Sequence, residues 1–264
     1  MRKSLVRPGR KGRKRAVVRA IDDVYRLAER RGWIQRLPAF ERDYHREYPQ
    51  LGDLEDGYPL VREECLRLLA IKDRLPNLEA LGGRYTAGGV NAIEWKTFAL
   101  KIGGFVRENC AQCPGTAGFL ERIPGLFTAF FSVLDARQYI RPHWGYYKGF
   151  VRYHLGVTIP DDNAHRLCRL RVNADPAQNA CRDRALIENA ETYYWRNGEG
   201  VMFDDTNLHD ARNDSDEVRV VLFLDLYRRS MPLPLDAFNR ISLALARLDG
   251  SVRRMHDAAI PRPN

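Results

Sequence analysis

The sequence predicts a mainly β protein with helices on both flanks, and three observations support this class. Apolar and aromatic runs of strand length follow one another between residues 93 and 227. Turn-forming residues separate these runs, for example Pro124-Gly125 and Pro160-Asp-Asp. Apolar residues at helical spacing occur mainly towards the two ends of the chain. Seven or eight antiparallel strands in such an arrangement most often form a jelly roll or a β-sandwich.

The predicted helices begin at residue 17. Apolar residues recur at intervals of three and four across 17–31, which predicts a helix there. Residues 32–60 contain three prolines and are expected to be irregular. A second helix fits 60–72, a short one fits 116–122, and the apolar pattern of 235–259 predicts a C-terminal helix.

The predicted strands occupy the middle of the chain. The run from Val218 to Tyr227 is the most continuous of them. An Asn197-Gly198 pair between two short apolar runs is typical of a two-residue hairpin turn. In chain order, strands are predicted at 93–101, 126–134, 150–159 and 166–172, in a hairpin over 193–203, and at 218–227.

The net charge is unevenly distributed along the chain. The 264 residues include 43 Lys and Arg and 34 Asp and Glu, which gives a net charge of +9. Residues 1–20 hold nine of the basic residues and no acidic residue, so the other 244 residues hold 34 of each sign. This distribution argues against a basic folded body, and nucleic acid is not an expected partner. It predicts a neutral domain that carries a cationic arm.

The arm is expected to comprise residues 1–16, which are polar and cationic, and to be mobile. Residues 17–264 are expected to form a single domain. Its β core is placed at about 90–230, with helical flanks at 17–75 and 233–260.

The composition also predicts a location. No apolar run approaches the ~18 residues that span a bilayer, and no apolar segment follows the basic N-terminus as in a secretory signal. Five cysteines, an odd number, do not suggest a disulfide scaffold. We therefore expect a cytoplasmic protein. Residues 2–19 are suited to peripheral contact with an anionic membrane, and a simply solvated terminus is the alternative.

Two histidines and an arginine form the candidate catalytic site. His143 is expected in a loop between two strands, and His209 in a loop just after a strand. Arg219 lies in an apolar strand, where a guanidinium is costly unless it pairs with an anion such as a carboxylate. Because imidazoles bind divalent transition metals, this set is typical of a metal site with an acidic co-substrate. The alternative is a jelly-roll binding module without enzymatic activity, in which the histidines are incidental.

Four sequence blocks carry a resemblance to a known family. The blocks are Pro142-His-Trp-Gly145, Arg152-Tyr-His-Leu-Gly156, Phe203-Asp-Asp-Thr-Asn-Leu-His209 and Arg219-Val-Val-Leu-Phe. In this order and spacing they resemble the aspartyl/asparaginyl β-hydroxylase family, whose bacterial relatives include lipid A 2-hydroxylases. The resemblance covers about residues 90–230. It implies a double-stranded β-helix, a cupin-like jelly roll, and a dioxygenase that uses Fe(II), 2-oxoglutarate and O2.

The resemblance also implies roles for individual residues. His143 and His209 correspond to the iron ligands, and Arg219 to the partner of the distal carboxylate of 2-oxoglutarate. Gly145 stands where the wider superfamily has a third, carboxylate ligand, which members of this family also lack. Residues expected to contact the co-substrate or line its pocket are Ser132, Arg152, His154 and Trp95.

The reaction implied by the resemblance is hydroxylation of an unactivated carbon. The first expected substrate is an Asp- or Asn-type side chain in a peptide or protein. The alternative is an acyl chain of lipid A or an aminolipid at the membrane surface, where the cationic arm would dock. The polar segment 173–191 is longer than expected for the lipid hydroxylases. We expect it to form a hairpin over the site, with an elongated surface turn as the alternative.

Overall fold

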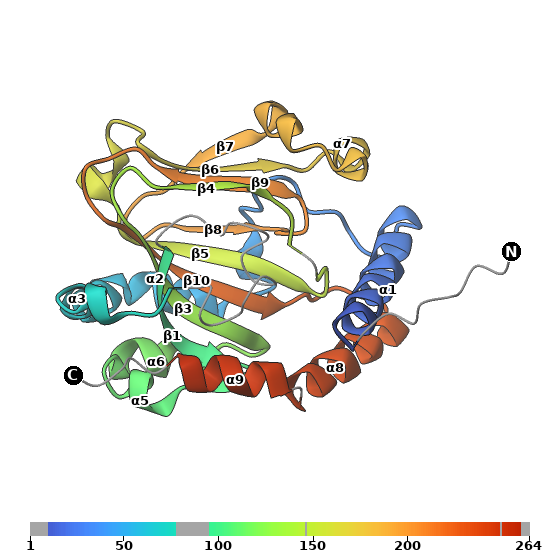
Figure 1. The fold of residues 1–264 in the computed structure, drawn as a ribbon, viewed down its shortest axis with the longest axis horizontal. Helices are drawn as coiled ribbons and strands as arrows, with labels where there is room; N and C mark the ends of the chain where they lie inside the picture. The colour runs from blue at the N-terminus through green and yellow to red at the C-terminus, as the bar shows by residue number, and fades with distance from the viewer. Residues whose placement is uncertain (1–9, 78–94, 146, 249, 260–264) are drawn as a thin grey trace, which may run out of the picture.

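The structure, a computed structural model, describes residues 10–77, 95–145, 147–248 and 250–259. Within these ranges two antiparallel sheets face each other (Figure 1). The larger sheet has the strand order β2-β1-β3-β10-β5-β8, and the smaller sheet has the order β4-β9-β6-β7. The strands are β1 (Trp95–Ile102), β2 (Gly104–Phe105), β3 (Leu126–Leu134), β4 (Tyr139–His143), β5 (Phe150–Thr158), β6 (Cys168–Asn173), β7 (Glu191–Tyr194), β8 (Gly200–Phe203), β9 (Leu208–Asn213) and β10 (Arg219–Tyr227).

The strand order identifies the fold. The eight strands from β3 to β10 divide into four in each sheet, and most of them pair with strands that are distant in sequence. The central strand β10 lies between β3 and β5, with all pairings antiparallel. This is the order of a double-stranded β-helix, so the predicted fold class is confirmed.

Helices cover the outer face of the larger sheet and one end of the molecule (Figure 1). Helix α1 crosses near α8 at that end, and α2, α3 and α6 lie against the sheet. The α-helices are α1 (Arg10–Arg30), α2 (Gln50–Asp56), α3 (Tyr58–Leu69), α5 (Arg107–Cys110), α6 (Pro114–Glu121), α7 (Pro176–Cys181), α8 (Leu233–Leu248) and α9 (Gly250–Ala258). Short 3-10 helices are η1 (Tyr44–Arg46), η2 (Lys72–Arg74), η4 (Pro160–Asn163) and η5 (Arg184–Asn189).

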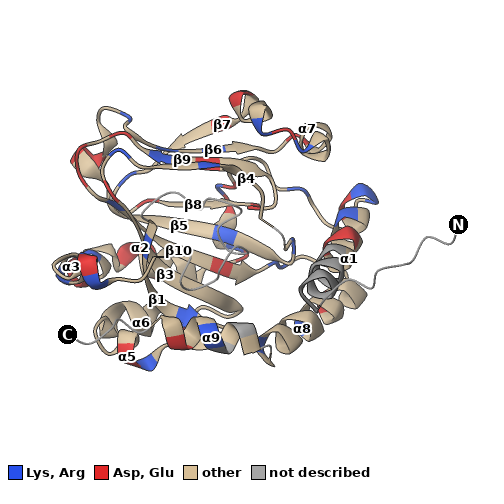
Figure 2. Cartoon of the chain, viewed as in Figure 1, with Lys and Arg blue, Asp and Glu red and all other residues tan. Residues whose placement is uncertain are grey.

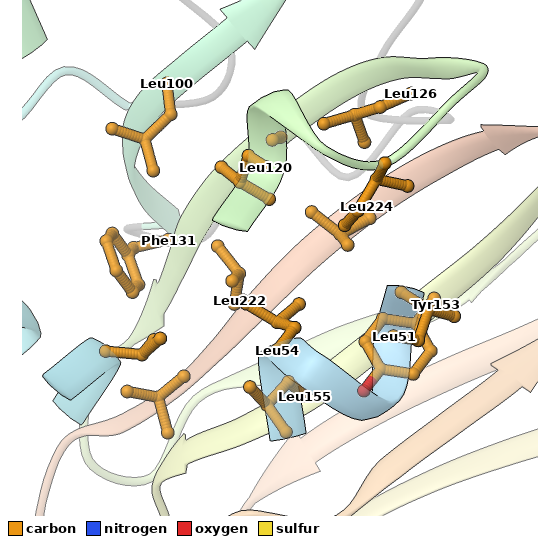
Figure 3. Close-up of a cluster of buried hydrophobic side chains, with 14 of the residues drawn as sticks. Leu51, Leu54, Leu100, Leu120, Leu126, Phe131, Tyr153, Leu155, Leu222 and Leu224 are labelled. Carbon is orange, nitrogen blue, oxygen red and sulfur yellow. The ribbon is translucent and has the colours of Figure 1, made fainter. Parts of the chain in front are cut away.

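The two faces of the larger sheet contribute to two separate cores. On the outer face, Leu222 and Leu224 of β10 pack with Leu54 of α2 and Leu120 of α6 (Figure 3). Because side chains alternate along a strand, the intervening residues of β10 point the other way, between the sheets. We call the apolar cluster between the sheets, which includes Phe223, the inner core. The candidate site adjoins this inner core.

Most of the predicted elements are present with shifted ends. The predicted strands correspond to β1, β3, β5, β6 and β10, and the predicted helices to α1, α3, α6 and the α8–α9 pair. Helix α1 begins at Arg10 rather than at residue 17, because Lys, Arg and Ala are good helix formers even without an apolar pattern. Residues 1–9 of the predicted arm lie outside the described residues. The additional elements β2, β4, β9, α2 and α5 are too short or too polar for periodicity to reveal.

The predicted hairpin around Asn197-Gly198 is wrong. Strand β7 pairs with β6 in the smaller sheet, whereas β8 pairs with β5 in the larger sheet. Gly198 does adopt the positive φ of a tight turn, 77°, but this turn carries the chain from one sheet to the other. The sequence signal of a tight turn is the same whether the flanking strands pair with each other or with distant partners.

The structure also shows the state of the cysteines and the hydropathy of the helices. All five cysteines are free thiols, which agrees with the expectation that the chain is not a disulfide scaffold. None of the helices in the described ranges combines the length and hydropathy needed to cross a bilayer.

Candidate active site

The structure places His143 and His209 opposite each other on neighbouring strands. His143 is the last residue of β4, His209 is the second residue of β9, and the two are paired across the smaller sheet. Their ring centroids are 4.1 Å apart. The expectation of two loop histidines is therefore corrected: both lie in strands. A register shift between Ile140 and His143 accommodates Pro142, whose presence had suggested a loop.

Hydrogen bonds fix the tautomer of both imidazoles. His143 Nδ1 lies 2.8 Å from the Arg141 carbonyl oxygen, and His209 Nδ1 lies 2.8 Å from the Asn207 carbonyl oxygen. Since a carbonyl only accepts, each Nδ1 carries the proton, which leaves each Nε2 with a lone pair that can bind a metal. Burial lowers the pKa of His143 to about 4 and the pKa of His209 well below its ordinary value. Both rings are therefore neutral at pH 7, as metal ligation requires.

Gly145, which stands where the wider superfamily has a carboxylate ligand, lies against the side chain of Asp205. A Cβ added to Gly145 would lie 2.1 Å from Asp205 Oδ2, so position 145 has no room for a carboxylate of its own. Asp205 is in turn held by Arg152, with 2.9 Å between Arg152 Nη2 and Asp205 Oδ2. Among the described residues, no group of three His, Cys, Asp or Glu side chains could hold a metal. A metal between His143 and His209 would therefore have two protein ligands among the residues that the structure describes.

We predict that Gly145→Ala destabilises the protein by about 1–3 kcal/mol, because the new methyl group overlaps the anchored carboxylate of Asp205. Gly118→Ala is the matched control, since a Cβ there meets nothing within 4 Å and alanine favours the helix. Thermal unfolding of both variants checks this expectation. Equal stability of the two variants would show that the Asp205 carboxylate moves freely.

Arg219 is a buried cation that has no anionic partner among the described residues. It begins β10 and is 1% exposed. Its Nε has no hydrogen-bond partner, and no carboxylate of the described residues forms an ion pair with it. Its guanidinium carbon lies 4.5 Å from the centre of the Trp195 ring. Burial lowers its pKa to about 10, so it stays charged at neutral pH. Burying an unpaired guanidinium lowers the stability of the folded protein unless a ligand supplies an anion to pair with it.

Further unpartnered polar atoms lie between Arg219 and the histidine pair. His154 is buried on β5, and neither of its ring nitrogens has a hydrogen-bond partner, nor does Trp195 Nε1. The ring of His154 lies 6.0 Å from Trp195 and 5.2 Å from Phe203, and Phe203 lies 5.7 Å from His209. Ring contacts thus run continuously from His209 to Arg219. The unpartnered nitrogens along this line fit a ligand that is rich in oxygen atoms.

Three more predicted site residues have partners within the chain. Trp95 and Ser132 contact each other, because Trp95 Nε1 donates to Ser132 Oγ at 2.8 Å. Arg152 lies 4.2 Å above the Phe223 ring and pairs with two carboxylates, including Asp225 at 3.0 Å. Burial raises the pKa of Asp225, and Arg152 opposes that rise. The direct contact of these three residues with a co-substrate stays a prediction.

The segment 173–191 forms helices rather than the predicted hairpin. It contains α7 and η5, and the buried Asn179 of α7 bonds to the residues next to His143 and His209. Asn179 Oδ1 accepts hydrogen bonds from Trp144 Nε1 at 2.9 Å and from the Leu208 N–H at 2.7 Å. Trp144 follows His143, and Leu208 precedes His209. The sequence gives only a weak signal for the hydrogen bonds of Asn179. Asp175 at the N-cap and Pro176 predict where a helix starts, but they do not predict which residues that helix contacts.

We predict that Asn179→Ala lowers the free energy of unfolding by about 2–4 kcal/mol, because it leaves two donors beside the histidines unpaired. Metal affinity is expected to fall about 10- to 100-fold, as for other residues that orient metal ligands. Calorimetric titration with Mn(II) and thermal unfolding measure the two effects. Asn189→Ala is the control, because the Asn189 side chain donates a hydrogen bond to Gln178 at the surface, away from both histidines. An unchanged metal affinity in Asn179→Ala would contradict the positioning role.

Comparison with known proteins agrees with the sequence resemblance. The family model described as Aspartyl/Asparaginyl beta-hydroxylase matches residues 55–229. The chain is 30% identical over 182 residues to the ornithine lipid ester-linked acyl 2-hydroxylase of Rhizobium tropici, covering 69% of this chain and 58% of that protein. It is 26% identical over 198 residues to the aspartyl/asparaginyl beta-hydroxylase of Homo sapiens, covering 68% of this chain and 22% of that protein.

Among solved structures, a non-heme alpha ketoglutarate dependent carbocyclase, SnoK from nogalamycin biosynthesis, aligns with a TM-score of 0.41 at 15% identity. That alignment covers 65% of this chain and 75% of the other. The chain spans less than two thirds of the length of the two sequence relatives. The match to the family model extends over most of the chain and contains every block that carries the resemblance. The chain therefore belongs to the aspartyl/asparaginyl β-hydroxylase family.

Proposed function

We propose that this chain is an Fe(II)- and 2-oxoglutarate-dependent dioxygenase that hydroxylates the acyl chain of an aminolipid. One observation carries the reaction class: ring contacts connect two metal-competent imidazoles to a buried arginine that lacks an anionic partner among the described residues. Family membership supports the same class. The 30% identity to an ornithine lipid acyl hydroxylase favours a lipid over the Asp or Asn side chain that the resemblance alone suggested.

His143 and His209 would hold the metal through their Nε2 atoms, with each ring oriented by the carbonyl that accepts from its Nδ1. Two neutral nitrogen donors and open positions suit a divalent transition metal such as Fe(II). When bound, iron and 2-oxoglutarate supply oxygen activation coupled to oxidative decarboxylation of the co-substrate to succinate. The protein contributes orientation, charge and exclusion of water.

Arg219 would bind the distal carboxylate of 2-oxoglutarate. A guanidinium offers two parallel N–H donors to a carboxylate, and the Arg219 guanidinium is already held over the Trp195 ring, 4.5 Å from its centre. His154 is neutral because burial lowers its pKa well below the ordinary value, so it offers one donor and one acceptor. Ser132 Oγ accepts from Trp95 Nε1, which leaves the serine hydroxyl proton to be donated to a co-substrate oxygen.

The inner core would keep this site dry. Phe203 and Trp195 are fully buried beside His154, and Phe223 is 5% exposed. Charge–charge interactions are stronger in such a water-excluded site than in water, which favours the oxoglutarate carboxylate on Arg219. The same apolar walls suit a hydrocarbon substrate.

Mass spectrometry tests this proposal. The protein is incubated with Fe(II), 2-oxoglutarate and O2, together with either an ornithine-type aminolipid or a pool of Asp- and Asn-containing peptides. We expect succinate and a lipid product heavier by one oxygen atom. A heavier product among the peptides alone would overturn the lipid assignment and leave the reaction class in place. Succinate formation that does not require the two histidines would overturn the reaction class.

A further inference from the structure

Helix α8 has an outward face that is almost entirely apolar. Of the ten large apolar side chains that are exposed in the described residues, four lie on this helix. Leu233 is 84% exposed, Ile241 61%, Leu245 63% and Leu248 83%. These positions fall on one side of an α-helix. We call the set the α8 face; its members are Leu233, Ala237, Ile241, Ala244, Leu245 and Leu248.

The opposite side of α8 already anchors the helix to the protein. Leu235 and Leu243 are buried, and Leu235 packs with Tyr25 of α1. Asn239 is fully buried and accepts a hydrogen bond from Tyr25 Oη at 2.8 Å. Helix α8 therefore has two apolar sides. One side packs on the rest of the protein, and the α8 face is left exposed. Exposed apolar patches of this kind mark interaction sites.

Contacts connect α8 to the candidate active site. Asn239 Nδ2 donates to the Gly149 carbonyl oxygen at 3.0 Å, and Asn239 Oδ1 accepts from Tyr147 Oη at 2.5 Å. Both partners belong to the loop that follows His143 and leads into β5. Lys148 of the same loop pairs with Glu29 of α1 at 3.1 Å. Helices α1 and α8 thus support the segment next to a predicted metal ligand (Figure 1).

The net charge of helix α8 is positive. Most of α8 is tan in Figure 2, and from Ala237 to Leu248 its charged residues are Arg240 and Arg247. The acidic residue at its start, Asp236, is paired with Arg240 at 2.8 Å, so the net charge of +1 on α8 corresponds to Arg247. Helix α1, which packs on α8, begins at Arg10, within the first 20 residues of the chain, and those 20 residues include nine basic and no acidic residues. An apolar helix face flanked by basic residues matches the surface of an anionic bilayer.

We propose that the α8 face docks on the surface of an anionic phospholipid membrane. The inference rests on the proposed function, for which the membrane is the source of the acyl substrate. The apolar side chains would enter the boundary between headgroups and acyl chains, and each basic residue near the surface contributes about 1 kcal/mol. A second copy of the chain is disfavoured as the occupant, because each copy carries a net charge of +9 and two copies repel each other.

Vesicle sedimentation tests the docking surface. The full chain is mixed with vesicles of phosphatidylcholine alone or of phosphatidylcholine with phosphatidylglycerol. We expect binding to the anionic vesicles, weaker binding at high salt, and a loss of at least about tenfold in the triple variant Ile241→Ser, Leu245→Ser, Leu248→Ser. The matched control is Leu66→Ser with Leu167→Ser, whose side chains are 43% and 38% exposed elsewhere on the surface. Both variants should retain the wild-type melting temperature, since exposed side chains are replaced.

Three outcomes would overturn the docking inference. The first is that the wild-type chain does not bind anionic vesicles, and the second is that the triple variant binds them as well as the wild type does. The third is that sedimentation velocity shows a wild-type dimer that the triple variant converts to a monomer.

A micelle assay distinguishes failure of the docking inference from failure of the proposed function. If only docking is wrong, the triple variant hydroxylates lipid in vesicles and in micelles at wild-type rates. If only the lipid substrate is wrong, vesicle binding persists and neither lipid preparation is hydroxylated.

Discussion

Replacing His209 by alanine is expected to abolish substrate-dependent succinate formation. The variant keeps one of the two imidazoles that would hold the metal, and no other His, Cys, Asp or Glu cluster in the described ranges could substitute. Loss of residues that merely orient ligands lowers metal affinity about 10- to 100-fold, so loss of a ligand is expected to exceed that range. His143→Ala should behave in the same way. Succinate release and Mn(II) affinity are the measurements.

His165→Ala is the matched control for these two variants. The His165 side chain is 77% exposed at the surface, so its removal should leave succinate release and metal affinity unchanged. Full activity in either His143→Ala or His209→Ala would refute the assignment of that residue as a ligand. Loss of activity with unchanged Mn(II) affinity would also count against it, since it would indicate a role other than metal binding.

Arg219→Met is expected to weaken the binding of 2-oxoglutarate and to leave the stability of the fold almost unchanged. Losing one partner of a buried, hydrogen-bonded charge pair costs about 2–5 kcal/mol, which corresponds to a rise of about 30-fold to several thousand-fold in the dissociation constant of 2-oxoglutarate. Without 2-oxoglutarate, however, the guanidinium has no carboxylate partner in the described residues. Its removal should then leave the free energy of unfolding within about 1 kcal/mol of wild type, or raise it. Calorimetric titration and denaturant unfolding measure the two quantities.

Arg228→Met provides the contrasting case. Arg228 pairs with Asp204, which is 1% exposed and also contacts Lys148. Breaking this buried pair should cost about 3 kcal/mol of stability and leave the affinity for 2-oxoglutarate unchanged in the folded protein. If Arg219→Met instead loses stability to the same extent and binds 2-oxoglutarate normally, Arg219 is a structural residue.

The strands of the larger sheet could be predicted from the sequence because they are long and apolar. Strand β10 is buried on both faces, so its run of Val, Leu and Phe is continuous and its arginine stands out. The strands that carry the histidines gave no such signal. Strand β4 contains Pro142, and β9 reads Leu-His-Asp-Ala-Arg-Asn, so neither shows a clear apolar alternation. Their pairing depends on residues that are far apart in sequence.

The candidate site was predicted only in part, and the missed residues share a physical reason. Gly145 could be recognised as unable to ligate, but the side chain that fills its place, Asp205, is 60 residues away in the chain. Asn179 contacts residues beside both histidines from a segment that had been expected to form a hairpin. Such roles arise from tertiary contacts, and local patterns of one sequence do not encode them.

An anaerobic titration of the metal-free protein with Fe(II) in the presence of 2-oxoglutarate tests the assigned site most directly. The readout is the visible charge-transfer absorption of an Fe(II)–oxoglutarate chelate. The assignments predict one chelate per chain in the wild type, none in His209→Ala, and in Arg219→Met a chelate that forms only at much higher 2-oxoglutarate concentration. An equally tight chelate in the wild type and in both histidine variants would contradict them.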